Sequence, residues 1–179
     1  DSTTDVGSDG TQNVATALPI PLVTDTGVSV VVPISGSTFI EAVRFYQDPE
    51  TAVDTEFSGT IDSTIFLDRP NGVGVEIRGT LYDYDSASGI KTLLGVSDTT
   101  FGGAETGELN FIVPVTGTLQ KNHRLLWVIA LRPKLSSKSF NVEVQYGGEV
   151  TNGISGDPSY LADSNGSFCV TPPANLSIN

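Results

Sequence analysis

Hydrophobic and polar side chains alternate with a period of two along most of this chain. The clearest stretch is 73–82, where Val75 and Ile77 alternate with Glu76 and Arg78. This period buries one face of a β-strand and leaves the other face in solvent. The pattern predicts strands at 28–33, 38–47, 56–67 with a bend near Gly59, 73–82, 90–96, 108–115, 124–131 and 139–146.

Turn-forming residues separate these predicted strands, and no helical pattern interrupts them. Gly, Pro, Asn and Asp gather at 68–72, 102–103, 120–122 and 132–134, where turns are expected. Eight or nine strands joined by polar turns predict an all-β fold, most simply an antiparallel two-sheet β-sandwich resembling a jelly roll. The expected core is Val30, Val32, Val75, Ile77, Leu81, Phe111, Val113, Leu125, Trp127, Ile129, Val142 and Val144.

The chain divides into three predicted parts. An extended N-terminal arm at 1–24 precedes the sandwich domain at 25–148, and a loop-like segment at 149–179 follows it. Within the last segment, 168–171 is the one stretch that favours a further short strand. The sandwich is therefore expected to carry extended arms at both ends.

The second half of the N-terminal arm is apolar. Pro19 and Pro21 confine 13–23 to extended backbone, which suits either an edge strand or an arm that reaches a neighbouring subunit. We expect the second arrangement, with this segment added as a strand to another copy, because its apolar side chains would otherwise be exposed. The arm residues are Val14, Leu18, Ile20, Leu22 and Val23.

Charge and composition favour an extracellular protein. Nine Lys and Arg against 21 Asp and Glu give a net charge of −12 and a pI near 4.2. That field repels phosphate backbones and anionic lipids, so we do not expect the chain to bind nucleic acid or to insert directly into a membrane.

The chain contains no methionine and begins at Asp1, which predicts proteolytic processing during export. Cys169 is the only cysteine, which excludes an intrachain disulfide.

One part of the sequence resembles a known kind of module. The pieces GTLYDYDSASGIKTLLG, FIVPVTGTLQKNHRLLWVIAL and FNVEVQYGG lie within residues 79–148. Together they are similar in strand rhythm to the β-sandwich modules of secreted hydrolases, such as the C-terminal domain of the X-prolyl dipeptidyl-peptidases. The resemblance implies a jelly-roll fold and a mostly structural role.

The residues offer no recognisable catalytic centre, so we expect the chain not to be an enzyme. His123 is the only histidine, and no G-x-S-x-G nucleophile elbow accompanies it. One histidine and one cysteine far apart lack the spacing of a zinc site. Trp127 lies in an apolar strand, which leaves Tyr82 and Tyr84 as a small aromatic platform for glycans.

The acidic composition favours calcium as a ligand. The segment 83–89 (DYDSASG) places the carboxylates of Asp83 and Asp85 and two hydroxyls before a glycine, and Ca²⁺ binds such oxygens. It departs from the EF-hand loop, because a third acidic position and a closing glutamate are missing. A hairpin turn that uses Asp and Ser for backbone hydrogen bonds is the structural alternative.

Two N-glycosylation sequons lie in the C-terminal segment, at Asn165-Gly-Ser and Asn175-Leu-Ser. An exported chain would present both Asn165 and Asn175 to a glycosylation machinery.

Three functions remain open. The first is a non-enzymatic structural subunit of an extracellular filament, tube or surface assembly, whose partners are copies of itself joined by β-strand addition. The second is a viral capsid or decoration protein of jelly-roll type. The third is a carbohydrate- or calcium-binding module of a secreted enzyme. Sizing of the purified chain separates filaments, closed shells and monomers.

Overall fold

The computed structural model describes residues 3–9, 11–16, 28–48, 50–68, 74–102, 107–146, 160–163 and 169–170. Within these residues the structure is almost entirely β, with one short 3₁₀ helix, η1 (Gly7–Asp9). The strands are β1 (Thr3–Asp5), β2 (Thr11–Thr16), β3 (Val28–Ser35), β4 (Ile40–Asp48), β5 (Thr55–Asp68), β6 (Val75–Tyr84), β7 (Lys91–Phe101), β8 (Gly107–Leu119), β9 (Arg124–Pro133), β10 (Ser139–Tyr146), β11 (Tyr160–Asp163) and β12 (Cys169–Val170).

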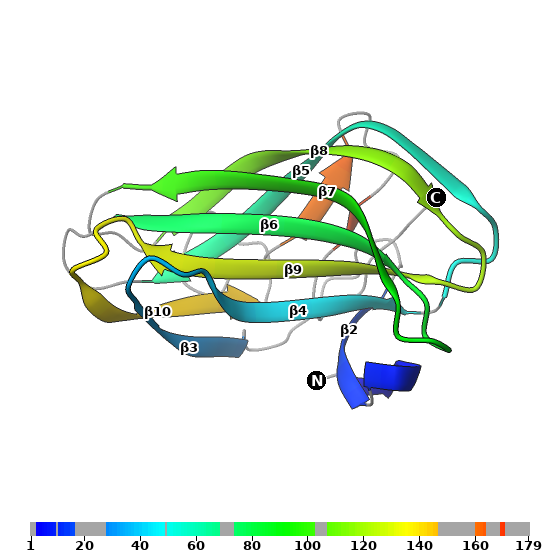
Figure 1. Cartoon of the computed structure of the whole chain (residues 1–179), viewed down its shortest axis with the longest axis horizontal. Coiled ribbons are helices and arrows are strands. Elements are labelled where there is room, and N and C mark those ends of the chain that lie inside the picture. The colour runs from blue at the N-terminus through cyan, green and yellow to red at the C-terminus, as the bar shows by residue number, and fades with distance from the viewer. Residues whose placement is uncertain are drawn as a thin grey trace.

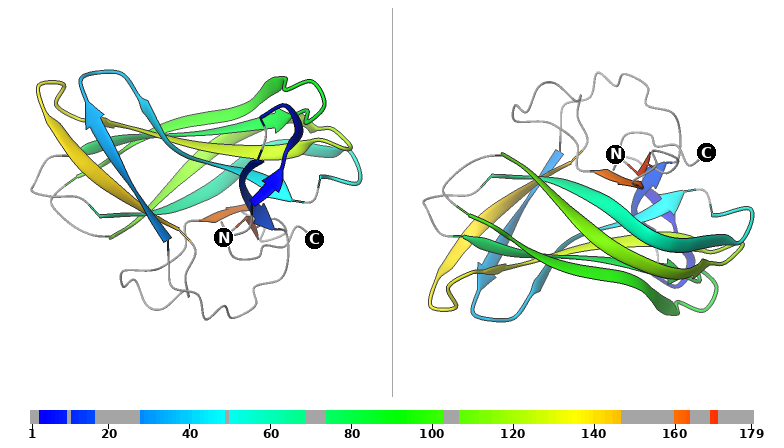
Figure 2. Two further views of the ribbon diagram at one scale, coloured as in Figure 1. Left: turned by 90° about the horizontal axis from the view of Figure 1, so that it is seen from below. Right: turned by 90° about the horizontal axis from the view of Figure 1, so that it is seen from above.

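Two antiparallel sheets form the sandwich (Figures 1 and 2). One layer has the strand order β4-β9-β6-β7 and the other has the order β8-β5-β10-β3. The layers join where β7 meets β8, at the single register position Gly95↔Val115. Five strands, β3, β5, β7, β8 and β9, are longer than the alternation predicted. For example, β7 continues to Phe101 through a stretch of polar residues whose backbone still pairs with β6.

The inward faces of the two sheets form one apolar core. In β6 the inward side chains are Val75, Ile77 and Leu81, all fully buried, as the alternation predicted. Trp127 of β9 is also fully buried, and its ring lies 5.7 Å from the ring of Phe45. The predicted core is confirmed for every residue whose side chain the structure describes, and only the side chain of Val30 lies outside that set.

One glycine shows how closely the two layers approach. Gly79 of β6 faces the ring of Phe111, and a Cβ atom at this position would lie 2.6 Å from the Cε2 atom of that ring. Real side chains essentially never come this close, so the sandwich requires the absence of a side chain here.

The N-terminal strands depart from the expected arm. Val14 of β2 lies opposite Tyr46, and β2 pairs in parallel with β4 of its own chain over three positions. This corrects the prediction that Val14 pairs with another copy, because the free edge of β4 lies within reach of the chain's own N-terminal segment. The other predicted arm residues, Leu18, Ile20, Leu22 and Val23, lie outside the described residues.

Two short strands belong to the C-terminal segment. β12 falls within the stretch 168–171 that favoured a strand, and it pairs with β11. β11 in turn adds to β5, with Leu161 opposite Ser63. The sequons at Asn165 and Asn175 lie outside the described residues, so their glycosylation stays a prediction.

Candidate functional site

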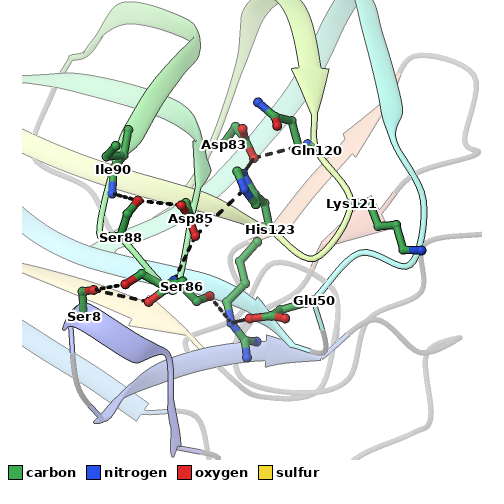
Figure 3. A network of polar contacts seen from close by, with 12 residues as sticks. Ser8, Glu50, Asp83, Asp85, Ser86, Ser88, Ile90, Gln120, Lys121 and His123 are labelled. Atoms are coloured by element: carbon green, nitrogen blue, oxygen red, sulfur yellow. Dashed lines mark hydrogen bonds and ion pairs between the residues drawn. The ribbon is translucent and has the colours of Figure 1, made fainter.

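A network of polar side chains lies at one end of the sandwich, where four connections meet (Figure 3). The β6–β7 turn contributes Asp85, the β8–β9 turn contributes His123, and the loop after β4 contributes Glu50. Ser8 of η1 approaches from the N-terminal segment. The sequence had marked Asp83 and Asp85, and the structure brings His123 to both of them.

Asp83 and His123 form a close pair between β6 and the β8–β9 turn. The His123 Nδ1 atom lies 2.8 Å from Asp83 Oδ1, and the Asp83 side chain is only 1% exposed. The backbone N–H of Gln120 also donates to Asp83 Oδ1, at 3.4 Å. His123 is fixed by its backbone as well, since its carbonyl accepts from the N–H of Thr51 at 2.9 Å. The buried carboxylate therefore orients the imidazole and ties the end of β6 to the β8–β9 turn.

Asp85 builds the β6–β7 turn. Its Oδ1 accepts from the backbone N–H of Ala87 at 2.9 Å, and its Oδ2 accepts from the hydroxyl of Ser88 at 2.5 Å. The hydrogen bond from Ser88, followed by the one from Ala87, lowers the pKa of Asp85. Gly89 closes the turn with a φ of 74°, a conformation that glycine adopts without strain. This is the turn that was the structural alternative to a calcium loop.

The geometry gives calcium little support at this turn. Asp85 Oδ1 lies 4.0 Å from the Nε2 atom of His123, so both predicted carboxylates face the same imidazole. The described part of the chain contains no group of three or more His, Cys, Asp or Glu side chains that could hold a metal ion. Calcium at Asp83 and Asp85 therefore stays a prediction, which the thermal midpoint with and without a chelator tests.

Arg124 lies beneath this network and is nearly buried. Its Nη1 atom donates to the carbonyl of Gln47 at 2.8 Å, and its Nε atom donates to the Ser86 hydroxyl at 3.2 Å. The Glu50 carboxylate lies 3.6 Å from the same Nε atom. These contacts compensate the burial of the guanidinium group and join the end of β4 to the β6–β7 turn.

The polar groups of this network are used to hold turns. The hydroxyls of Ser86 and Ser88 contact Arg124 and Asp85, respectively, rather than His123. The Asp–His pair has the orientation of two members of a catalytic triad, but the serines in the network bond elsewhere. The arrangement is therefore suited to fixing loops at the end of the sandwich.

A second cluster adjoins this network on the outer face of the β4-β9-β6-β7 sheet. Val6, Tyr46, Tyr84 and Leu126 are all at most 1% exposed and pack together there. The expected glycan platform is thereby corrected for Tyr84, because the N-terminal segment covers its ring, whereas Tyr82 is half-buried beside it. The sequence carried no signal for this contact, because Val6 and Tyr84 lie far apart in the chain.

Asp9 of η1 fastens the N-terminal segment to this face. Its Oδ2 atom accepts from Lys91 Nζ at 2.6 Å and from the hydroxyl of Tyr46, and Arg44 Nη1 lies 3.5 Å away. Burial disfavours the ionised carboxylate, but the hydrogen bonds from Lys91 and Tyr46 outweigh it and lower the pKa of Asp9. Burial and the Asp9 contact raise the pKa of Tyr46, which keeps its hydroxyl protonated as a donor.

Comparisons with known proteins assign no family to this chain. No family model matches it, and no curated protein matches it.

Within the described residues, the structure has no helix long and apolar enough to cross a membrane.

Several solved structures are similar to parts of the chain. An alpha-amino acid ester hydrolase matches with 8% identity and a TM-score of 0.49, over 76% of this chain and 32% of that one. An aminopeptidase from the marine sediment archaeon Thaumarchaeota archaeon matches with 8% identity and a TM-score of 0.44, over 57% and 23%. A CocE/NonD family hydrolase from Staphylococcus aureus matches with 8% identity and a TM-score of 0.47, over 92% and 37%.

The chain therefore spans between 23% and 37% of the length of these hydrolases. Similarity at this level carries no argument about activity or substrate.

Proposed function

We propose that the chain is a non-enzymatic structural subunit of an extracellular assembly, and that copies join by adding strands at the free edge of β3. The observation that carries this proposal is the character of that edge. Among the described strands, β3 pairs with β10 alone, along all eight of its residues. Its sequence, VSVVVPIS, contains no charged residue, although the whole chain carries a net charge of −12.

An edge of this kind is rare in proteins that remain monomeric. Natural edge strands are usually short, charged, bulged or covered, because a row of free N–H and C=O groups pairs readily with another strand. β3 has one such protection, Pro33, which removes a single N–H donor. Val31 is 57% exposed on the same strand. Strand addition would pair the free backbone groups and cover part of this apolar surface.

The test places one positive charge on the edge. In Val31→Lys, the new ammonium group would be costly to bury between copies, whereas the cross-strand neighbour Glu143 accommodates it in the single subunit. We expect the parent chain to form particles that light scattering and negative-stain microscopy detect. The Val31→Lys variant should not form these particles.

The matched control is Ile112→Lys on β8. Ile112 is 55% exposed and also faces an acidic neighbour, Asp62, but β8 pairs with β5 along its whole length and meets β7 at Gly95↔Val115. This variant should assemble like the parent chain. Equal loss of assembly in both variants would show that β3 has no special role.

The alternatives predict different particles in the same experiment. Closed shells that depend on β3 would favour a capsid or decoration protein. A parent chain that stays monomeric at all concentrations would contradict assembly and would favour a carbohydrate- or calcium-binding module of a secreted enzyme. Titration of that monomer with Ca²⁺ or with oligosaccharides then tests the module directly.

A further inference from the structure

A strand that adds to the edge of β3 must have a free edge of its own. Among the described strands, β5, β6, β9 and β10 pair on both of their sides. The strands β1, β2, β11 and β12 have at most six residues each. The longer strands β4, β7 and β8 carry charged side chains, such as Arg44, Asp98 and Glu108. The described strand that is long, uncharged and free on one side is β3 itself.

The charge of the chain also favours contact at this edge. Copies with a net charge of −12 repel one another, so they approach most easily where carboxylates are sparse. The β3–β10 pair contains one charged side chain, Glu143, which lies opposite Val31. If two β3 strands paired at Val31, the two Glu143 carboxylates would be three strand spacings apart, about 14 Å. This separation exceeds the Debye length of about 8 Å in physiological salt.

The alternation of β3 limits how two copies of it can pair. Val32 and Ile34 are buried, whereas Val31 is 57% exposed and Pro33 is exposed. A two-fold axis perpendicular to the sheet makes the strands antiparallel and keeps both buried faces on the same side. A slip of one residue would place exposed positions opposite buried ones. The axis must therefore pass beside a residue and not between two residues.

An axis at Val31 suits the side chains of this edge. The two exposed Val31 side chains would lie opposite each other and cover part of each other's apolar surface. Pro33 would lie opposite position 29 of the other copy, which is a serine. Pro33 lacks an N–H donor, but its carbonyl group can still accept a hydrogen bond across the new contact.

We infer that the partner at the β3 edge is the β3 strand of a second copy, paired antiparallel about a two-fold axis at Val31. This inference rests on the proposed structural function and adds the partner strand, its direction and its register. Each described chain presents this edge once, so the contact closes as a dimer. The β8-β5-β10-β3 layers of the two copies then form one continuous sheet, and larger particles contain this dimer as their unit.

The test is disulfide cross-linking in a Cys169→Ser background, which removes the only native cysteine. Val31→Cys would place two thiols directly opposite each other, with Cα atoms about 4.5–5.5 Å apart, a separation that a disulfide spans. Ile112→Cys is the matched control, because Ile112 is equally exposed but lies on β8. We expect Val31→Cys to form the covalent dimer at least about tenfold faster on a non-reducing gel, because pairing raises the effective concentration of the thiols.

A second pair of variants tests the register. Ser29→Cys mixed with Pro33→Cys should give a mixed disulfide, whereas each variant alone should cross-link as slowly as Ile112→Cys. Particles that form from Val31→Cys without faster cross-linking would overturn this inference and leave the proposed function intact, since another strand would then occupy the edge. Rapid cross-linking in a chain that forms dimers but no larger particles would support the β3 pairing and contradict the proposed assembly.

Discussion

The two outer strands on one side of the sandwich, β3 and β4, are protected in different ways. The edge of β4 is partly covered by β2 of the same chain, and η1 packs on the adjoining sheet face through Val6 and Asp9. The edge of β3 has no such cover among the described strands and carries no charge. The chain thus closes one edge with its own N-terminal segment, whereas no described strand covers the other, which is the edge of the proposed contact between copies.

Both edge strands pack on the same core, so a core mutation should destabilise both of them. We expect it to cause the largest loss in the free energy of unfolding. Trp127→Ala removes the largest fully buried side chain and leaves a cavity beside Phe45. We expect a loss of about 3–5 kcal/mol in the free energy of unfolding, measured by urea denaturation. A loss below about 1 kcal/mol would mean that the two layers do not form one cooperative core.

Val6→Ala should weaken only the docking of the N-terminal segment at the β4 side of the sandwich. We expect roughly 2 kcal/mol to be lost from docking of the N-terminal segment, because the Val6 side chain is fully buried there. Proteolysis near residues 5–16 should therefore become faster, while the amides of β6 and β9 keep their exchange protection. Global unfolding at the same denaturant concentration as Trp127→Ala would contradict a separable segment.

The pH dependence of docking should follow Asp9. Its folded pKa is lowered below the ordinary value of 3.8, so the contribution of its contacts is fully present above that value. The contribution is lost as the pH falls through the folded pKa. Protection of the segment should fall in acid in the parent chain and change less in Asp9→Asn. Identical acid profiles for the two chains would exclude Asp9 as the titrating group.

The smallest loss of stability should come from breaking an ion pair on the outer face, away from both edges. Arg78 and Asp98 form two hydrogen bonds of 2.7 Å, and both side chains are more than 40% exposed. We expect Asp98→Asn to cost less than about 1 kcal/mol, because solvent screens an exposed pair. A larger loss in thermal denaturation would show that the stacking of Arg78 on the ring of Phe39 depends on this pair.

The sequence was sufficient for the parts of the fold that depend on local pattern. The period of two located the eight main strands, β3 to β10, and the inward phase of each strand identified core residues such as Ile77 and Trp127. The segment 83–89 was also correctly identified as a turn-forming stretch between two strands, and the structure shows its hydrogen bonds.

The missed features all depend on contacts between distant segments. His123 meets Asp83 across 40 positions in the chain, and no local pattern encodes that pairing. Tyr84 is buried only because Val6 and Asp9 reach it from the N-terminus. The parallel pairing of β2 with β4 was missed for the same reason, since the composition of 13–16 suits any free edge.

Hydrogen exchange of the β3 amides tests the central claim most directly. Mass spectrometry would compare the parent chain when dilute and when concentrated to the point of assembly, with β9 as an internal reference because it pairs on both of its sides. Strand addition at the β3 edge predicts that amides of residues 28–35 become protected on assembly, whereas those of β9 stay equally slow in both samples. Assemblies whose β3 amides exchange as fast as in the dilute chain would contradict it.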